Sequence, residues 1–421
     1  MAVKTFFKPV FLSTLICIFV FYSGLFDIPD RTHVRSLIKS EDIIEVSGKL
    51  ISSPAKTGSG SWYTATLSLN SAADTQRLCS SATGRLKVML PCELAEAFSP
   101  GKLYSSVNKD SKQLKTLLFE AGGYYTFQGR YSKNYFYVQK CTASFWPASW
   151  KGHFAKLRAL CRLQFKRLMY SWGSGGGLLL ALLCGAREYT DTETQDAFRH
   201  AGLSHILALS GMHLSMFSAI AMFFGNRVGI KKITFILRIV TLIAFVWFAG
   251  FSPSLTRAFI CAMLMIAAAI AGAQKPDTLS ILCFAFLLQS ALCPQDIQSV
   301  AFILSYGALA GILLTSRFFN RFSSKFSPHP IASSLSAATG AQTVTAPVSL
   351  KIFGTFSPIG IVSATVVSPF ITFFIYSGLF LIFISLIFPF LAKASGIFIN
   401  LLYTVITYIV NIFSLVPNWH S

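Results

Sequence analysis

The sequence has 421 residues, of which 53% are hydrophobic and only 12% are charged, and 40 of them are phenylalanine. Soluble domains have about 25% charged residues, so the composition excludes an ordinary soluble protein and predicts a large membrane domain with a smaller soluble one. The formal net charge is +20, from 36 Lys and Arg against 16 Asp and Glu. Such an excess either collects in cytoplasmic loops of a membrane protein or attracts a polyanion such as nucleic acid.

The first predicted element is a transmembrane helix within residues 1–26. Lys4 and Lys8 precede a nearly unbroken apolar run from Pro9 to Phe26. This run is longer than the apolar part of a usual signal peptide, and no small-x-small cleavage site closes it. We therefore expect an uncleaved first span with its basic end inside, which exports the residues that follow.

Residues 27–150 have the pattern of a β domain. Five segments alternate apolar and polar residues and are separated by clusters of Ser, Gly, Asn and Lys. They are IIEVSGKLISS (43–53), WYTATLSLNS (62–71), GRLKVMLP (84–91), GYYTFQGRY (123–131) and NYFYVQKCTASF (134–145). A period of two is typical of half-buried strands, and five short strands favour a small barrel, of which the oligonucleotide-binding (OB) barrel is one type.

Three cysteines, Cys79, Cys92 and Cys141, fall in this segment, where a disulfide would persist after export. Three thiols permit one pair with one left over, and the pairing stays open. The remaining cysteines lie in or beside apolar runs and are expected to fill the core. No Cys-x-x-Cys or Cys/His spacing indicates a zinc site, so we expect no metal and no cofactor.

Residues 151–172 are predicted to form an amphipathic helix. At about 100° per residue, one face is apolar and an adjoining stripe is basic. The apolar face is Phe154, Leu157, Cys161, Phe165 and Leu168, and the basic stripe is Lys151, Arg158, Arg162 and Lys166. Such a helix typically lies flat in the headgroup region of a bilayer, so membrane lipid is its expected partner. The basic stripe is also a candidate for guiding a DNA backbone.

Residues 173–421 form the predicted membrane domain. After a flexible, glycine-rich stretch at 173–177, the run LLLALLCGA is too short to cross a core of about 30 Å, and we expect a re-entrant or tilted segment. Further apolar runs follow at about 204–224, 232–250, 252–272, 276–293, 297–316, 335–350, 358–389 and 395–416. We expect a polytopic α-helical protein with about 8–10 spans.

Basic loops predict the orientation of these spans. With the amino terminus inside, the loops that contain Arg227, Lys275 and Arg317 fall inside, whereas Asp296 falls outside. This pattern satisfies the positive-inside rule. The carboxyl terminus falls outside if residues 358–389 cross once, and inside if they form two short or broken helices.

The stretch from Ala201 to Ile220 is the first candidate functional segment, because it places histidines, serines and glycines within apolar sequence. An unpaired polar group in hydrocarbon costs about 2–7 kcal/mol, so these residues face a protein interior or a water-filled path. The spacing of His205 and His213 predicts one helix with both imidazoles roughly on one side, about 80° apart. Between them, Ser210-Gly211 permits the close approach of another helix or a break in this one.

A second unusual segment is 250–260. Pro253 fits the first turn of a helix and Ser252 its N-cap, which places Arg257 one turn inside the bilayer. An arginine there snorkels outward, pairs, or lines a wet cavity. The expected orientation puts Arg257 and His205 toward the outer side, so the two are predicted to share one vestibule.

Catalytic interpretations fit these residues less well. A zinc protease would need His-Glu-x-x-His, yet no glutamate lies near His205 or His213. Ser210 lies in Ala-Leu-Ser-Gly-Met, and not in the Gly-x-Ser-x-Gly of serine hydrolases. The chain also lacks the Gly-x-x-x-x-Gly-Lys-Ser/Thr of nucleotide-driven pumps. We therefore expect no catalytic residue: either the histidines only hydrogen-bond between helices, or they border a polar conduction path.

Three segments carry a family resemblance. GLSHILALSGMH (202–213) resembles a signature of the ComEC/Rec2 family of competence proteins, Gly-Leu-x-His-Leu-Leu-Ala-hydrophobic-Ser-Gly-Leu-His. Residues 250–258 resemble a second signature, in which a glycine, then proline and serine, precede Arg-Ala at the head of the next span. ILSYGALAGI (303–312) resembles the Gln-Leu-Ser-Phe segment of the same family. The resemblance covers nearly the whole chain.

The resemblance implies a membrane channel through which one DNA strand enters the cytoplasm during natural transformation. The implied pore or scaffold positions are His205, Ser210, Gly211, His213, Pro253, Ser254, Arg257 and Ser305. The exported barrel corresponds to the family's OB-like domain at the channel mouth. A narrow cationic path suits a single strand, because phosphates need compensating charge and a duplex is too wide.

The implied location is the inner (cytoplasmic) membrane of a bacterial cell, with residues 27–150 outside the cytoplasm. The implied partners are single-stranded DNA, a DNA-receptor protein, a cytoplasmic ATP-driven motor and a separate nuclease, and the protein is a candidate oligomer. Many family members continue into a metallo-β-lactamase-like domain, whereas this sequence stops at Ser421 without a His-x-His-x-Asp cluster. We therefore expect no enzyme activity in this polypeptide.

Two positions depart from the family pattern. Ile303 stands where the family often has glutamine, and Ala364, five residues before Pro369, stands where it often has asparagine. Because two polar positions are lost, a divergent member with another substrate is an alternative. The rival class is a membrane-embedded metal-dependent hydrolase or a small-solute transporter.

Overall fold

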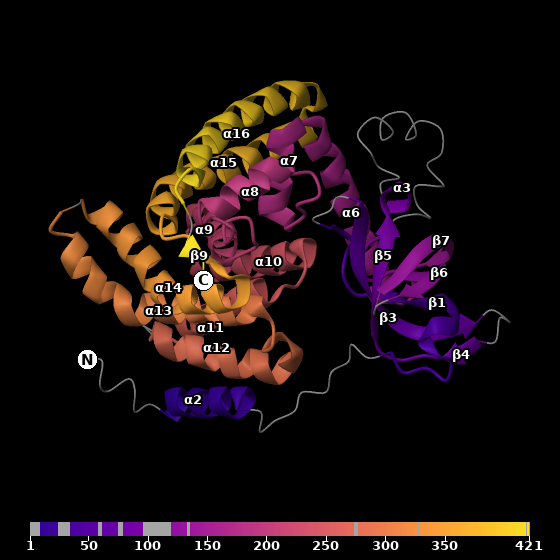
Figure 1. Cartoon of the computed structure of the whole chain (residues 1–421). Coiled ribbons are helices and arrows are strands. Elements are labelled where there is room, and N and C mark those ends of the chain that lie inside the picture. The colour runs from indigo at the N-terminus through magenta and orange to yellow at the C-terminus, as the bar shows by residue number, and fades with distance from the viewer. Residues whose placement is uncertain are drawn as a thin grey trace. The chain divides into compact units, whose positions relative to one another are not determined.

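The computed structural model of the chain describes residues 9–23, 34–57, 61–74, 79–95, 119–132, 135–272, 277–326, 328–417 and 419–420. The chain divides into two compact units, which we describe separately. The barrel unit comprises Pro29–Ser171 and Ala186–Glu188, and the membrane unit comprises Met1–Ile28, Trp172–Gly185 and Tyr189–Ser421. Figure 1 labels the elements of both. Lys4 and Lys8 of the predicted first span lie outside the described residues.

The barrel unit contains five main strands, which agree closely with the five predicted segments. They are β1 (Ile43–Leu50), β3 (Trp62–Asp74), β5 (Arg85–Pro91), β6 (Tyr124–Ser132) and β7 (Tyr135–Phe145). Two short strands, β2 (Ala55–Lys56) and β4 (Cys79–Ser81), both pair with β3. Burial alternates residue by residue along β6, so the predicted period of two is confirmed.

These five strands close into a barrel. β1 pairs with both β3 and β6, β3 pairs with β5, and β6 pairs with β7, all antiparallel. The circle is completed by β5 and β7, which run parallel, with Lys87 opposite Tyr135 and Met89 opposite Tyr137. The resulting order, β1-β3-β5-β7-β6-β1, is that of an OB-like barrel, so the predicted fold of this unit is confirmed.

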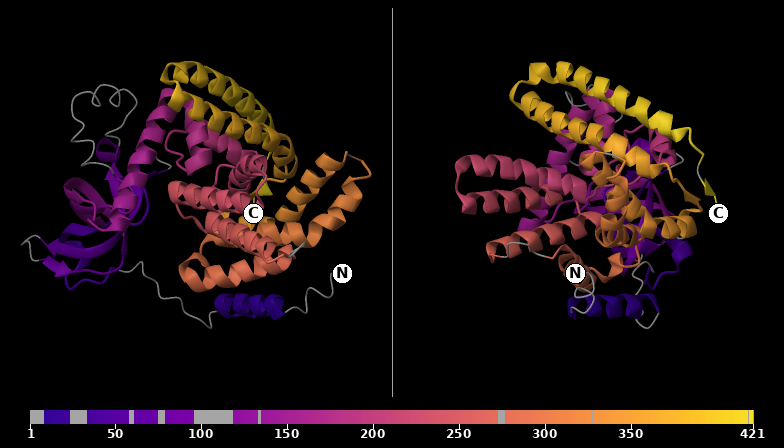
Figure 2. Two further views of the ribbon diagram at one scale, coloured as in Figure 1. Left: turned by 180° about the vertical axis from the view of Figure 1, so that it is seen from behind. Right: turned by 90° about the vertical axis from the view of Figure 1, so that its left-hand side faces the viewer.

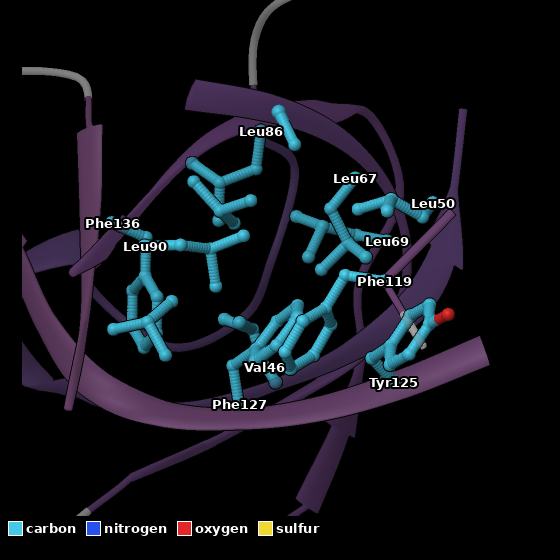
Figure 3. Close-up of a cluster of buried hydrophobic side chains, with 14 of the residues drawn as sticks. Val46, Leu50, Leu67, Leu69, Leu86, Leu90, Phe119, Tyr125, Phe127 and Phe136 are labelled. Atoms are coloured by element: carbon cyan, nitrogen blue, oxygen red, sulfur yellow. The ribbon is translucent and has the colours of Figure 1, made fainter. Parts of the chain in front are cut away.

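Apolar side chains fill the interior of the barrel. Figure 3 shows leucines of β3 and β5 pointing toward the same interior as the rings of Phe119, Tyr125 and Phe127. The ring centroids of Tyr125 and Phe127 lie 5.7 Å apart, and that of Phe119 lies 5.2 Å from Tyr125. In a barrel of this size side chains occupy the centre. A long ligand such as a nucleic acid strand can therefore bind only to the outer surface.

The three cysteines of the barrel unit, Cys79, Cys92 and Cys141, form no disulfide with one another. Burial raises the pKa of Cys141 to about 11. Because the thiolate is the reactive form, Cys141 is a poor nucleophile at neutral pH and acts as a small apolar side chain.

The amphipathic helix predicted at 151–172 is α6 (Trp150–Ser171), and it belongs to the barrel unit. Its buried residues include Ala159 and Leu163, which pack against Trp146 and Leu160. The predicted apolar face is a different one, and its residues Phe154 and Leu157 are exposed. The helix itself is therefore confirmed, and it packs through the face opposite to its predicted apolar stripe.

The membrane unit begins with α2 (Pro9–Tyr22), a 14-residue helix that packs against α12 (Thr278–Leu292). The hydroxyl of Tyr22 donates to the Ile297 carbonyl at 2.9 Å. At about 1.5 Å per residue, the described helix is about 21 Å long, shorter than a bilayer core of about 30 Å.

The glycine-rich stretch 173–177 is not flexible, and that prediction was wrong. It forms the first turns of α7 (Gly173–Cys184), whose residues from Gly175 onward are all buried. A Cβ atom at Gly177 would lie 2.1 Å from the Tyr189 carbonyl oxygen, so glycine is required for this packing and does not loosen the chain. At 12 residues α7 is too short to cross a membrane, which agrees with the predicted re-entrant or tilted segment.

The first of the helices that follow forms in a polar stretch, and the others overlap the predicted apolar runs. They are α8 (Thr192–His200), α9 (Gly211–Val228), α10 (Lys231–Ala249), α11 (Pro253–Ile270), α12, α13 (Val300–Ser323), α14 (His329–Phe353), α15 (Gly360–Ile387) and α16 (Ala392–Ser414). Figure 2 shows α13 beside α14 and α15 beside α16, pairs that are in contact. Thr355–Phe356 (β8) pairs with Trp419–His420 (β9).

Five helices in the described part of the chain are long and apolar enough to cross a membrane. They are α10, α11, α13, α15 and the stretch Pro389–Ser414 that contains α16, while α2, α7 and α12 are shorter apolar helices. The protein is thus a multi-span helical protein, as predicted. Residues 358–389 contribute one continuous helix with Pro369 inside it, which is the single-crossing case of the predicted orientation.

Candidate functional site

The segment between α8 and α9 is not helical, so the prediction that His205 and His213 share one helix was wrong. α8 ends at His200 and α9 begins at Gly211. The side chain of His205 is exposed in the intervening turns, whereas that of His213 is only 1% exposed. The alternative that Ser210-Gly211 marks a break in the helix is the one that the structure shows.

The break is enforced by close packing around Gly202. This residue has a φ of +73°, and a Cβ atom on it would lie 2.7 Å from the Cα atom of Gly360, the first residue of α15. The hydroxyl of Ser363 donates to the Ala201 carbonyl at 2.6 Å, and that of Ser357 donates to the His200 carbonyl at 2.9 Å. The chain therefore turns at 201–203, because Ser357, just before α15, and Ser363, within it, bind the carbonyl groups that a continuing helix would have used.

Ser210 and His213 form the N-terminal cap of α9. Ser210 is the N-cap residue, and its backbone N–H donates to Nδ1 of His213 at 3.2 Å, an arrangement equivalent to a capping box. Since Nδ1 accepts this bond, the proton of a neutral imidazole is assigned to Nε2. Nε2 is buried and has no hydrogen-bond partner in the described residues. His213 therefore fixes the start of α9 and keeps one N–H group unused.

α11 starts as predicted, with Ser252 as its N-cap and Pro253 in its first turn. The Ser252 hydroxyl oxygen accepts from the Leu255 backbone N–H at 3.4 Å. One turn further on, Arg257 donates from Nη1 to the Ser305 carbonyl of α13, and its guanidinium lies 5.9 Å from the ring centroid of Tyr306. Arg257 therefore joins α11 to α13 through a neutral carbonyl oxygen and an aromatic face.

Arg257 also lies at the start of α9. A Cβ atom on Gly211 would lie 3.4 Å from Nη2 of Arg257, so the guanidinium lies close to the first residue of this helix. Within the described residues, no carboxylate forms an ion pair with Arg257, whose charged and polar neighbours are Cys261 and Tyr306. The guanidinium and the N-terminal end of α9 both contribute positive potential, and together they favour an anion.

Three residues that sequence reasoning did not select complete this cluster. Gln289 of α12 is fully buried and donates from Nε2 to the Pro253 carbonyl at 3.2 Å and to Oδ2 of Asp296 at 3.1 Å. Its Oε1 accepts from the hydroxyl of Tyr306 at 2.9 Å. A glutamine inside an apolar run was the available signal, since a buried amide needs partners from other helices.

The structure thus brings most of the predicted positions together. Ser210, Gly211 and His213 at the start of α9 meet Arg257 of α11, which is bound to Ser305 of α13. Ser254 is tied to the same helix, because its hydroxyl donates to the Ala301 carbonyl at 3.4 Å. No hydrogen bond or ion pair links His205 to this polar cluster within the described residues, so the shared vestibule of His205 and Arg257 stays a prediction.

The four residues predicted to guide DNA do not form one free stripe. Lys151 is exposed, but Arg162 and Lys166 turn toward the buried Glu120, each with a nitrogen 3.4 Å from Oε1. Lys166 also lies 2.8 Å from a carboxylate oxygen of Glu188. Arg158 contributes to the same positive surroundings of Glu120. Arg162 and Lys166 are therefore ion-pair partners of buried carboxylates, and a DNA-guiding role for the four residues stays a prediction.

Glu120 stays ionised inside the barrel unit. Burial raises its pKa, but Arg162, Lys166, a hydrogen bond from Ser53 and Arg158 lower it further, to about 2. A carboxylate with several cationic partners is stable when buried, whereas any one of these charges alone would be costly.

A separate cavity of about 200 Å³ lies between α8 and α16 and contains none of the predicted site residues. Its lining includes Asp191, Glu193, Thr194 and Tyr403, and the two hydroxyl oxygens of Thr194 and Tyr403 are 2.8 Å apart. In the described part of the chain, no three His, Cys, Asp or Glu side chains are grouped closely enough to hold a metal ion.

Together these features define a multi-span helical membrane protein with an OB-like barrel and a polar cluster between its helices. The chain belongs to the competence protein family, because a family model described as "Competence protein" matches residues 182–420. ComE operon protein 3 of Bacillus subtilis (strain 168) is 27% identical to it over 203 residues. That match covers 48% of this chain and 25% of the relative, so the chain spans about a quarter of its length. No solved structure matches the chain.

Proposed function

We propose that this protein is the membrane channel component through which one strand of DNA enters a bacterial cell during natural transformation. Membership of the competence family supports a role in DNA uptake, and the matched residues 182–420 include every residue of the polar cluster. The observation that carries the finer proposal is Arg257, a cation in an apolar helix whose hydrogen-bond acceptor is a neutral carbonyl.

The charge of Arg257 suits a polyanion for a physical reason. A guanidinium paired with a carboxylate is neutralised, whereas one held by a carbonyl oxygen and an aromatic face keeps its full positive charge. A DNA strand that crosses a low-dielectric region needs such charges along its path, since each phosphate loses its counterions and water. We propose that Arg257, with the N-terminal end of α9, compensates phosphates as they pass.

The outer surface of the barrel supports the same proposal, for the step at which DNA first binds to the protein. Outward side chains of β3, β5 and β7 bring together aromatic rings and cations: Trp62 meets Tyr137 edge to face with centroids 5.4 Å apart, and Lys87 lies 5.9 Å over the ring of Tyr135. OB barrels bind single strands on this side, by stacking bases on aromatic rings beside a basic groove. We propose that this surface, the aromatic patch, receives the strand.

The aromatic patch gives a direct binding prediction. Replacing Trp62 or Tyr137 with alanine is expected to weaken binding of a labelled single-stranded oligonucleotide to the purified full chain by about tenfold each, since one stacked base contributes about 1–3 kcal/mol. Fluorescence anisotropy in detergent micelles at fixed salt measures it. Tyr124→Ala, which removes an outward ring from β6, is the matched control and should bind normally. Equal losses in all three variants would contradict a localised patch.

Uptake of labelled DNA tests the proposal in cells. Deleting the gene is expected to abolish entry of one labelled strand into the cytoplasm while surface-bound DNA remains, and the wild-type gene restores entry. Entry that is unchanged in the deletion strain would rule the proposal out. The strand needs an external driving force, and we propose a cytoplasmic ATP-driven motor, a DNA-receptor protein and a separate nuclease as partners, in the inner membrane.

The alternative, a membrane-embedded metal-dependent hydrolase or small-solute transporter, makes a different prediction. Metal analysis of the purified full chain, with and without a chelator, separates the classes. Stoichiometric zinc that a chelator removes together with an activity would support the hydrolase and count against a passive DNA channel.

A further inference from the structure

α6 carries an exposed apolar stripe along one side. Trp150, Phe154 and Leu157 are 69%, 55% and 51% exposed, and Cys161 is also exposed. Their spacing of four, three and four residues places them on one helix face, over about 16 Å. Large apolar side chains exposed singly are ordinary, but a continuous stripe on one helix marks an interaction surface. We call these four residues the α6 stripe.

The stripe is not the face through which α6 packs in its own unit. Ala159 and Leu163 lie on the opposite side and are buried, and a Cβ atom added to Gly122 before β6 would touch Ala155 at 2.8 Å. On the same buried side, Arg162 and Lys166 form ion pairs with Glu120. One side of α6 is therefore fixed to the barrel unit by packing and charge, and the stripe faces away.

The charges of α6 select the partner of the stripe. The helix contains six Lys and Arg residues and no acidic one. Lys151, next to Trp150, is exposed at the edge of the stripe, whereas Lys156 is exposed about 100° around the helix from Leu157. The ammonium of Lys151 lies 5.5 Å over the ring of Trp150, so cation and apolar surface meet at one edge. A face of Trp, Phe and Leu with a lysine at its edge is typical of helices that lie in the headgroup region of a bilayer with anionic lipids.

The position of α6 in the chain supports the same partner. α6 ends at Ser171, and α7, an apolar helix of the membrane unit, begins at Gly173. A second copy of the chain fits less well, because pairing two stripes would bring together helices that carry only positive charges.

We propose that the α6 stripe lies in the headgroup region of the phospholipid bilayer, with Lys151 on an anionic headgroup. α6 then makes contacts on two faces. One face is bound to the barrel through Glu120 and its partners, and the other face is in contact with lipid. The barrel would therefore be fixed on the membrane surface and would not swing on a free linker. This proposal does not depend on DNA conduction, since its test requires no DNA.

Photocrosslinking of the full chain in native membranes tests the proposal. The photoreactive residue p-benzoylphenylalanine replaces Phe154 or Leu157, and mass spectrometry identifies what becomes attached. We expect phospholipid adducts at both positions, in yields similar to those at Ile236, an exposed residue of the long apolar helix α10. The matched control is Leu37, an exposed leucine of the barrel unit outside the stripe, where we expect several times less lipid.

Each other outcome would overturn the proposal. Attachment of Phe154 and Leu157 mainly to a second copy or to another protein would assign the stripe to a protein interface. No adduct at either position, with normal labelling at Ile236, would place the stripe in water.

The charge requirement has its own test in vesicles. In reconstituted vesicles, the change Lys151→Gln should lower the lipid yield from position 154 when phosphatidylglycerol is present, and leave it unchanged in pure phosphatidylcholine. The matched control Lys156→Gln, on another side of the helix, should leave the yield unchanged in both. A yield with phosphatidylglycerol that Lys151→Gln leaves unchanged would refute the role of Lys151. Loss of DNA uptake in other variants would leave these results untouched.

Discussion

Arg257 and Arg238 are both arginines inside apolar helices, and they form an internal comparison at the scale of single residues. Arg238 of α10 donates from Nε to the hydroxyl of Ser218 in α9 at 3.1 Å, whereas Arg257 donates to the Ser305 carbonyl and lies at the start of α9. Both are polar links between helices. Only Arg257 shares its surroundings with a helix N-terminus, so only Arg257 is placed to hold an anion.

The first prediction at this scale compares Arg257→Gln with Arg238→Gln. Arg257→Gln is expected to lower entry of labelled DNA about tenfold or more, since a hydrogen bond to a charged group contributes about 1.5–3 kcal/mol. Arg238→Gln should leave entry close to normal. Immunoblotting of membranes checks that both variants accumulate equally. If the two variants took up DNA equally at equal protein levels, Arg257 would not be part of the DNA path.

The second prediction separates the two possible roles of His213. Because His213 occupies the position where Glu or Gln closes a capping box, His213→Gln retains an acceptor for the Ser210 N–H and a spare N–H donor. We expect His213→Gln to keep protein level and uptake, and His213→Leu to lose about 1 kcal/mol of helix stability and most of the protein. Membrane level and uptake are measured together. Normal level with lost uptake in His213→Gln would show a specific need for imidazole.

Sequence patterns predicted this cluster only in part, for a reason visible in single residues. Ser252 and Pro253 are local signals, and the helix start they predicted is confirmed. Gln289 and Tyr306 have no local pattern, since they matter only through contacts with one another and with Asp296. Such contacts depend on which helices are neighbours, and a period or a cap does not contain that information.

At the scale of elements, the break between α8 and α9 determines where the polar cluster forms. A continuous helix through 201–220 would have carried His213 far from its cap and left no N-terminus beside Arg257. The apolar composition of this stretch favoured a span, but the contact between Gly202 and Gly360 outweighs it. Long-range backbone contact of this kind overrides local propensity, so the helix prediction failed here while the barrel strands, whose alternation is local, were predicted nearly residue by residue.

The prediction for this element compares two glycines of similar conformation. Gly202 and Gly229 have φ values of +73° and +76°, but a Cβ atom would meet Gly360 at 2.7 Å in the first case and nothing within 4 Å in the second. Gly229→Ala should cost only the strain of a left-handed residue, about 1–2 kcal/mol. Gly202→Ala should cost more and lower the thermal stability of the membrane unit further, measured by aggregation in detergent. Similar losses would show that the close contact contributes nothing.

At the scale of the whole molecule, the basic residues have more than one structural role. The net charge of +20 was ambiguous in the sequence between topology and polyanion binding. The structure shows a third use, because Arg162 and Lys166 hold Glu120 inside the barrel unit and Lys166 also pairs with Glu188. Residues distant in sequence therefore meet at one buried carboxylate, which a helical wheel drawn for α6 alone could not predict.

This cluster gives the fourth prediction, which concerns pH. The pKa of Glu120 is lowered from 4.5 to about 2, so its ionised form stabilises the folded unit fully above pH 4.5, and this contribution is lost as the pH falls toward 2. Glu120→Gln should destabilise the barrel unit by roughly 3 kcal/mol at neutral pH, because it leaves buried cations without an anion. The same change should also make the stability of the barrel unit less dependent on pH between 4.5 and 2.

Limited proteolysis of the full chain in detergent, across temperature and pH, measures this effect. The matched control is Glu45→Gln, which alters a surface carboxylate that accepts a hydrogen bond from Gln128 at 2.8 Å and should cost less than about 1 kcal/mol. An acid profile for Glu120→Gln that matches the wild type would show that another group is responsible.

The buried helix α7 restricts where the protein can move. A Cβ atom on Gly175 would lie 3.0 Å from the carbonyl oxygen of Ile399 in α16, and one on Gly378 of α15 would lie 2.6 Å from Leu179. At these two points glycine lets the helices pack closely, so we expect α7, α15 and α16 to move together. In the proposed channel, we therefore expect an opening wide enough for a nucleotide to form at the boundary of α9, α11 and α13, where hydrogen bonds can be exchanged for water. The signature residues of the family would then line that opening.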